Sequence, residues 1–152
     1  MDNKEDVLKL RKLSQQYAYT SIQLHESIGR EIGMSGTDHK YLGFLIQKGP
    51  MTAGKLAVLT GLTTGAVTGL IDRFEDKNLV KRQPDKNDRR KIIIVPNVEK
   101  IIKLITPFYK DFQENTDELF ASFSIQELKI LERYFLNSLE IMNRKIEKIN
   151  KK

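Results

Sequence analysis

Apolar side chains recur at intervals of three and four over residues 5–32, the spacing that places them on one face of a helix. A second apolar run ends at the Gly-Pro pair 49–50, where a helix has to stop because proline cannot continue it. Either Thr37 or Asp38 is expected to cap this second helix. Residues 5–48 are therefore predicted to form two helices.

The next segment, residues 52–77, has the pattern of two short helices joined by a turn. Thr52 is expected to cap the first helix, Gly61 to end it in a left-handed conformation, and Thr63 to cap the second. The apolar residues of the second helix share one face, which is expected to point inward: Val67, Leu70, Ile71 and Phe74. The segment is predicted to be a helix-turn-helix.

Two runs suited to strands follow, at residues 79–83 and 91–95. The turn-prone stretch Pro-Asp-Lys-Asn-Asp lies between them, and the second run is rich in β-branched residues. Residues 79–95 are therefore predicted to form a β-hairpin. The fold class is mainly α with this one small β element.

The C-terminal part, residues 97–150, is predicted to be helical again. Asn97 can cap a helix that Pro107 is expected to bend, because the proline ring removes one backbone hydrogen bond. Ser124 and Glu127 form a capping-box pattern at the start of the last helix. The terminal helices carry more apolar surface than the small centre can cover, which predicts a homodimer with these residues at its interface: Leu10, Leu13, Leu128, Leu131, Phe135, Leu139 and Met142.

The distribution of charge bears on the partner of the protein. The chain of 152 residues has a formal net charge of +6. Between residues 48 and 95, ten basic residues stand against five acidic ones, so most of the surplus lies in about a third of the chain. A concentrated cationic surface is typical of proteins that bind a phosphate backbone, although an ordinary solvated face of a lysine-rich protein has the same composition.

The outward face of the second short helix is expected to be bare. Gly65 and Gly69 lie on it, and each glycine inside a helix costs about 1 kcal/mol relative to alanine. Close approach of the helix to the major groove of DNA would explain them, unless they face another part of this protein. The residues of this helix expected to contact DNA are Thr63, Thr64, Gly65, Thr68, Gly69 and, at the margin, Arg73.

The hairpin turn carries two adjacent arginines that suit insertion into a narrow, electronegative minor groove. DNA would repel Asp88, so this carboxylate is expected to hold an arginine side chain in place. A solvated charged turn is the alternative interpretation. The hairpin residues expected to take part in DNA binding are Lys86, Asp88, Arg89, Arg90 and Lys91.

Residues 49–95 resemble the winged helix-turn-helix of the MarR family (multiple antibiotic resistance regulators). The stretch LAVLTGLTTGAVTGLIDRFEDKNLVKR follows the family's order of small helix, turn, recognition helix and strand. The family's wing signature Asp-x-Arg falls on Asp88 and Arg90. Long helices at both ends fit the family's interlocked dimer, so the similarity of layout spans one domain over residues 1–152.

The resemblance implies a dimeric transcriptional regulator, usually a repressor, on an inverted-repeat operator in double-stranded DNA. The recognition helices would enter successive major grooves, and the wings the flanking minor grooves. Many members of the family respond to phenolic or other small organic ligands, and Tyr17, His39 and Tyr41 are candidates to line such a pocket. Each of the three is also explained as an ordinary surface or core residue of a helix.

The sequence departs from the family pattern at three places. Asn78 stands where glycine is frequent, but asparagine also takes the left-handed conformation. After the wing, Val95-Pro96 replaces the usual Leu-Thr, and the glycine that the family carries a few residues later is missing. Gly69 stands where a basic residue is common, which leaves open how this helix reads bases.

Other classes of protein find little support. There is no cysteine, no phosphate-cradling glycine loop and no Ser/His/Asp set at a recognisable spacing, so neither an enzyme nor a cofactor is expected. The only two histidines, His25 and His39, lie on separate predicted helices, and no metal site is expected. A cytoplasmic protein without a membrane segment is expected, because neither a signal-peptide core nor a long apolar run occurs. The remaining alternative is a winged helix that docks an acidic protein instead of DNA.

Overall fold

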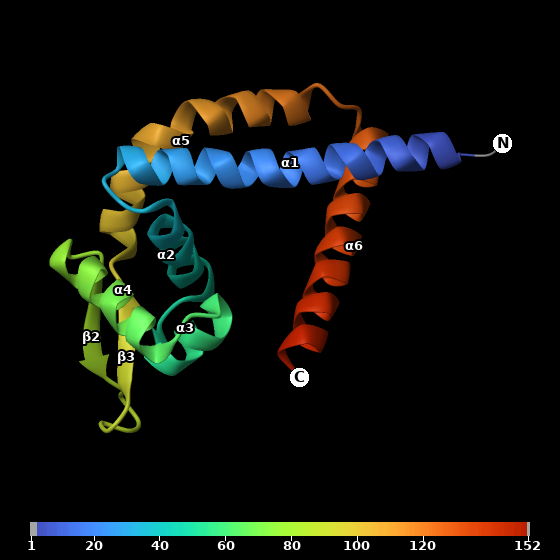
Figure 1. Ribbon diagram of the computed structural model, residues 1–152. Coiled ribbons are helices and arrows are strands. Elements are labelled where there is room, and N and C mark those ends of the chain that lie inside the picture. Colours follow the sequence, from blue (N-terminus) through green and yellow to red (C-terminus); the bar gives the residue numbers. More distant parts are fainter. Residues whose placement is uncertain (1–2, 152) are drawn as a thin grey trace. The chain divides into compact units, whose positions relative to one another are not determined.

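The computed structural model describes residues 3–151, which form six helices and three strands (Figure 1). In chain order they are α1 (Lys4–Glu31), α2 (Gly36–Lys48), β1 (Met51–Thr52), α3 (Ala53–Thr60), α4 (Thr64–Asp76), β2 (Val80–Pro84), β3 (Ile92–Pro96), α5 (Val98–Ala121) and α6 (Ile125–Asn150). The chain divides into two compact units, the first ending at Pro107 and the second beginning at Phe108. The division falls inside α5, at the proline whose ring removes a helical hydrogen bond.

The predicted helix-turn-helix is confirmed together with its boundaries. Thr52 and Thr63 are the caps, and their hydroxyl groups accept hydrogen bonds from the N–H groups of Lys55 and Ala66 at 3.1 and 3.3 Å. Gly61 ends α3 with a φ of 70°, in the left-handed region that glycine enters without strain. The turn between the helices is therefore specified by local chemistry.

A three-stranded antiparallel sheet in the order β1-β3-β2 contains the predicted hairpin. Both hairpin strands begin one residue later than expected. Asn78, just before β2, has a φ of 55°, as its place in the family pattern predicted. The sequence did not predict β1, where Met51 and Thr52 pair with Ile94 and Ile93. A strand of two residues is too short to show an alternating pattern.

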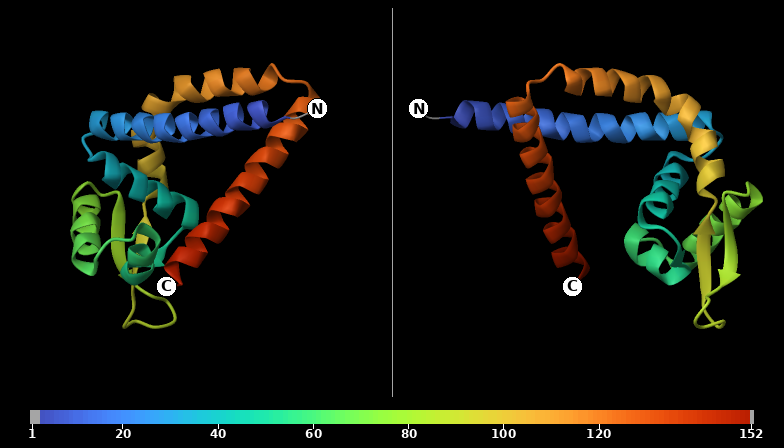
Figure 2. Two further views of the ribbon diagram at one scale, coloured as in Figure 1. Left: turned by 45° about the vertical axis from the view of Figure 1, so that its right-hand side comes forward. Right: turned by 180° about the vertical axis from the view of Figure 1, so that it is seen from behind.

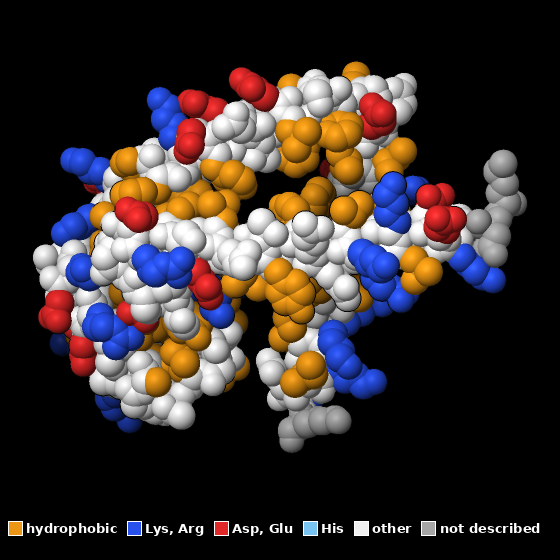
Figure 3. Space-filling model, turned by 45° about the horizontal axis from the view of Figure 1, so that its top comes forward, with side chains coloured by type: hydrophobic (Ala, Val, Ile, Leu, Met, Phe, Trp, Pro, Cys, Tyr) orange, Lys and Arg blue, Asp and Glu red, His pale blue; other side chains and the backbone are white. Residues whose placement is uncertain are grey.

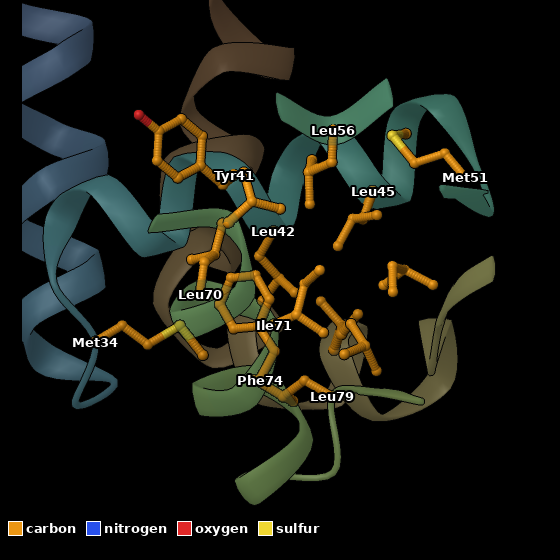
Figure 4. Close-up of a cluster of buried hydrophobic side chains, with 14 residues drawn as sticks. Met34, Tyr41, Leu42, Leu45, Met51, Leu56, Leu70, Ile71, Phe74 and Leu79 are labelled. Atoms are coloured by element: carbon orange, nitrogen blue, oxygen red, sulfur yellow. The ribbon is translucent and has the colours of Figure 1, made fainter. Parts of the chain in front are cut away.

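The core of the first unit lies between the sheet and helices α2, α3 and α4 (Figure 4). The predicted inward face of α4 is confirmed, because Val67, Leu70, Ile71 and Phe74 are at most 1% exposed. Ile101 in the first turn of α5 is also fully buried. The recognition helix therefore has one fixed rotation about its axis, and its opposite face is turned to solvent.

The expectation that Thr37 or Asp38 caps α2 is wrong. The cap is Ser35, whose hydroxyl accepts a hydrogen bond from the N–H of Asp38 at 3.0 Å, and Gly36 lies in the first turn of the helix. An added Cβ at Gly36 would lie 2.7–2.9 Å from the side chain and backbone of Glu26 in α1. Glycine is present here because α1 and α2 approach each other closely, and not because it breaks a helix.

Gly36→Ala is expected to lower the free energy of unfolding by about 1–3 kcal/mol, because α1 and α2 would have to move apart. Urea unfolding followed by circular dichroism measures the change. Gly43→Ala is the matched control in the same helix, since no atom lies within 4 Å of its added Cβ and alanine favours the helix. Equal stability of the two variants would contradict the close packing.

The second unit comprises the end of α5 and all of α6. The capping box is confirmed: the hydroxyl of Ser124 accepts a hydrogen bond from the N–H of Glu127, and the carboxylate of Glu127 accepts one from the N–H of Ser124. No residue of α6 is buried, although its apolar seam runs the length of the helix. Hydrophobic side chains are likewise visible on the surface in Figure 3.

No single helix within residues 3–151 is long and apolar enough to cross a membrane. Helices α3 and α4 reach the required length and composition only as a pair, and they meet at a bend of 110°.

Candidate nucleic-acid interface

The outer face of α4 is open, as the two glycines predicted. Thr63, Thr64, Gly65 and Thr68 are all exposed, and nothing lies within 4 Å of an added Cβ at Gly65. The hydroxyl of Thr68 donates to the carbonyl of Thr64 at 3.0 Å, so the side chain has a fixed orientation on the helix. Gly69 is half-buried, and an added Cβ there would lie 3.4 Å from Nη1 of Arg73 in the same helix. Of the two glycines, only Gly65 therefore faces open space within the described part of the first unit.

Arg73, at the edge of this face, is held by a carboxylate from another helix. Its Nε and Nη2 donate to the two carboxylate oxygens of Asp38 at 2.7 and 2.9 Å. The hydrogen bonds from Arg73 are the main reason that the pKa of Asp38 lies below its usual value. The sequence predicts a DNA contact for Arg73 and a capping role for Thr37 or Asp38, and no sequence signal predicts the pairing of Arg73 with Asp38 across 35 positions.

The tip of the β2–β3 hairpin is shaped by two aspartates. One carboxylate oxygen of Asp85 accepts hydrogen bonds from the N–H groups of Asn87 and Asp88 at 2.6 and 3.0 Å. These bonds, first that from Asn87, lower the pKa of Asp85. This role of Asp85 was not predicted, although an aspartate two residues before a turn amide is a known turn signal.

The prediction that Asp88 holds an arginine is confirmed for Arg90. The Asp88 carboxylate accepts hydrogen bonds from the backbone N–H of Arg90 at 3.1 Å and from its Nε at 3.2 Å. The side chain of Arg90 is nevertheless 92% exposed. Lys86, Arg89 and Lys91 are exposed beside it. The hairpin turn projects beyond the helices of the first unit in both views of Figure 2, so this set of cations is free to meet a partner.

Arg82 connects the hairpin to the recognition helix, a contact that the sequence analysis missed. Its backbone N–H donates to Glu75 at 2.8 Å, its Nη1 pairs with the same carboxylate, and its Nη2 donates to Asp72 at 2.6 Å. Both carboxylates belong to α4. β2 and α4 are therefore linked by a cation and two anions in addition to the shared core.

The ion pairs divide the basic residues of the segment 48–95 into two groups. Arg73, Arg82 and Arg90 have carboxylate partners inside the protein. Within residues 3–151 the other seven are exposed and have no ion pair: Lys48, Lys55, Lys77, Lys81, Lys86, Arg89 and Lys91. These seven supply the long-range positive field of this surface.

The three predicted ligand-pocket residues are not brought together as one set. Tyr17 is 67% exposed on α1, whereas His39 and Tyr41 are buried in α2. The His39 ring stacks on His25 of α1, with 6.1 Å between the ring centroids, and Tyr41 packs into the core. Within residues 3–151, no cluster of three or more histidine, aspartate or glutamate side chains could hold a metal ion.

The first unit has the arrangement of a winged helix-turn-helix. Helices α3 and α4 are joined by a short turn, and the β2–β3 hairpin that follows has a cationic tip. Residues 32–91 match the MarR family. Over 129 residues the chain is 34% identical to the uncharacterized HTH-type transcriptional regulator YcgE of Bacillus subtilis, covering 85% of this chain and 83% of that protein. It is 26% identical to the HTH-type transcriptional regulator MhqR of the same organism, covering 87% and 92% of the two chains. The chain belongs to the MarR family and is a DNA-binding transcriptional regulator.

Solved structures have the same fold. A MarR family protein from Bacillus stearothermophilus superposes with a TM-score of 0.72 at 25% identity, covering 94% of this chain and 99% of that one. A mutant MarR from E. coli in complex with operator DNA has a TM-score of 0.56 at 20% identity, covering 91% and 99%. The predicted fold class is thus confirmed over almost the entire chain.

Proposed function

We propose that this protein is a homodimeric repressor that binds an inverted-repeat operator, with α4 in the major groove and the β2–β3 wing in the adjacent minor groove. The observation that carries the proposal is the open face of α4 beside a wing tip whose arginine is held but exposed. The exposed face of α4 is available for base contacts in the major groove, and Arg90 is oriented for insertion into a narrow minor groove. The complex of the E. coli MarR with operator DNA supports the proposal, since that protein has the same fold.

The remaining residues of the proposed contact set follow from the same arrangement. Thr63, Thr64 and Gly65 lie at the N-terminal end of α4, where unpaired backbone N–H groups attract phosphate oxygens. Thr68 presents a methyl group that can contact the methyl group of thymine. On the wing, Lys86, Arg89 and Lys91 add exposed positive charge, and Asp88 positions Arg90.

The dimer is proposed to form through the exposed apolar residues of α1, α5 and α6. Leu10, Leu13, Leu139 and Met142 are each at least 50% exposed, and Phe135 is 40% exposed. Surface of this kind along helices at both ends of the chain requires a partner, and a second copy doubles the DNA contacts. Release by a small aromatic or other organic effector is part of the proposal, and a panel of phenolic acids added to the preformed DNA complex tests it.

Arg90→Ala is expected to weaken binding to selected duplexes by about 1–3 kcal/mol and to relax the preference for A·T pairs flanking each half-site, because the wing loses the cation that enters the minor groove. Duplexes selected by the wild-type protein from a randomised pool supply the probe, and titration gives the affinity. Arg144→Ala is the control, since this exposed arginine of α6 also pairs with a carboxylate, that of Glu140. An Arg90→Ala protein with unchanged affinity and base preference would refute the wing assignment.

A further inference from the structure

Arg73 presents one edge of its guanidinium to the open face of α4. Its Nε and Nη2 are bound to Asp38, and Nη1 has no hydrogen-bond acceptor within residues 3–151. Nη1 is the nearest atom to an added Cβ at Gly69, at 3.4 Å. Side chains of a helix lean toward its N-terminus, so a residue covers the surface one turn before its own position. Arg73 therefore occupies the space beside Gly69.

Asp38 fixes this arrangement. The carboxylate belongs to a residue that is 8% exposed, and Ser35 holds the backbone of Asp38 at the start of α2. A two-point contact between a carboxylate and a guanidinium sets the plane of the guanidinium as well as its position. The long side chain of Arg73 therefore loses little further rotational freedom when it binds a partner.

The pairing also changes what Arg73 can contribute to binding. The charge of the guanidinium is balanced by Asp38, so the pair adds little to the attraction of phosphates. What remains is a directional donor with two N–H bonds on Nη1. Guanine presents two adjacent acceptors, N7 and O6, in the major groove, whereas adenine places an amino donor beside N7. Nη1 can donate hydrogen bonds but cannot accept them, so it favours guanine over adenine at this position.

We propose that Arg73, held by Asp38 and given room by Gly69, reads a guanine in each half-site through Nη1, so that Asp38 is a positioning residue for base recognition. The inference rests on the proposed function, because it requires α4 to lie in a major groove. The family commonly carries a basic residue at the position of Gly69. The proposal assigns base reading to Arg73 instead, one helical turn later. Because Gly69 has no side chain, it leaves the space in which the guanidinium of Arg73 can approach the base edges of the major groove.

The test compares base preferences and salt dependence among variants on duplexes that the wild-type protein selects from a randomised pool. Arg73→Lys keeps the charge but cannot keep both contacts to Asp38, and it is expected to reduce the preference for one guanine per half-site by about 5- to 150-fold. The doubly substituted Arg73→Met/Asp38→Asn protein keeps the net charge and is expected to lose the same preference. The dependence of affinity on salt should be unchanged in both.

Gly69→Ala separates a loss of base recognition from a loss of folding. Its methyl group would make an ordinary contact with Nη1 and would favour the helix, so stability should be equal or higher while the guanine preference falls. Arg144→Lys is the control with no expected effect. Equal weakening on all sequences would assign Arg73 to a phosphate and overturn the inference, as would a full guanine preference in Arg73→Lys. If the wild-type protein selects no sequence at all, the proposed function itself fails.

Discussion

Raising the salt concentration from 50 to 200 mM is expected to weaken binding of this protein to duplex DNA by about 10³- to 10⁵-fold. Each phosphate that a lysine or arginine neutralises releases condensed counterions, and this range corresponds to roughly 6–10 phosphate contacts. A dimer needs about half of these contacts from each protomer. The seven unpaired basic residues between positions 48 and 95 are enough to supply them. Fluorescence anisotropy at a series of salt concentrations gives the slope of log affinity against log salt.

Two single variants test whether the salt dependence comes from the unpaired basic residues. Arg89→Ala removes an unpaired cation from both wings and is expected to reduce the slope by about 2, at roughly 0.9 per contact. Arg73→Lys should leave the slope as it is, because position 73 remains paired with Asp38. An absence of duplex binding at 50 mM salt would favour the alternative of a winged helix that docks an acidic protein.

Replacing Leu139 and Met142 together by glutamate is expected to raise the dissociation constant of the dimer by at least about 10³-fold. Both side chains are more than half exposed in the protomer, so the substitutions spare its fold. Burying one such side chain contributes about 1.5–3 kcal/mol, and every substitution occurs twice in a symmetric dimer. A loss of only about 4 kcal/mol in total already corresponds to 10³-fold. Sedimentation velocity over a range of concentrations measures the equilibrium.

The control is Asn137→Glu, which places one glutamate on the polar face of α6. It is expected to leave the dimer intact. A Leu139/Met142 variant that dimerised at the same concentration as wild type would exclude this seam from the interface. Monomers that bound a full operator as tightly as wild type would refute the requirement for a dimer.

The features predicted correctly from the sequence are those that neighbouring residues specify. Thr52, Thr63 and Ser124 cap helices with hydrogen bonds to residues three positions away, and Gly61 ends a helix through its own backbone freedom. The inward face of α4 follows from helical periodicity alone. These features can be predicted because each interaction joins residues within one helical turn of one another, so it does not depend on the tertiary structure.

The features missed depend on residues distant in the sequence. β1 exists only because Met51 and Thr52 find a partner in β3. The close contact of Gly36 with Glu26 depends on how two helices cross, which the periodicity of either helix does not show. The pairing of Asp38 with Arg73 spans 35 positions, and no spacing rule connects them. Site residues could therefore be identified by type and by face, while the contacts that orient them could not.

The link from Arg82 to Asp72 and Glu75 has a consequence for how operators of this protein can change over time. Because Arg82 links β2 to α4, the base pairs that the proposed binding mode assigns to the helix and to the wing would lie at one set separation along the duplex. A single inserted base pair would turn the second group by about 34° around the DNA axis, out of reach of a tethered hairpin. Under the proposed binding mode, target sites can therefore exchange bases within a half-site, whereas a change in the length of a half-site is expected to abolish binding.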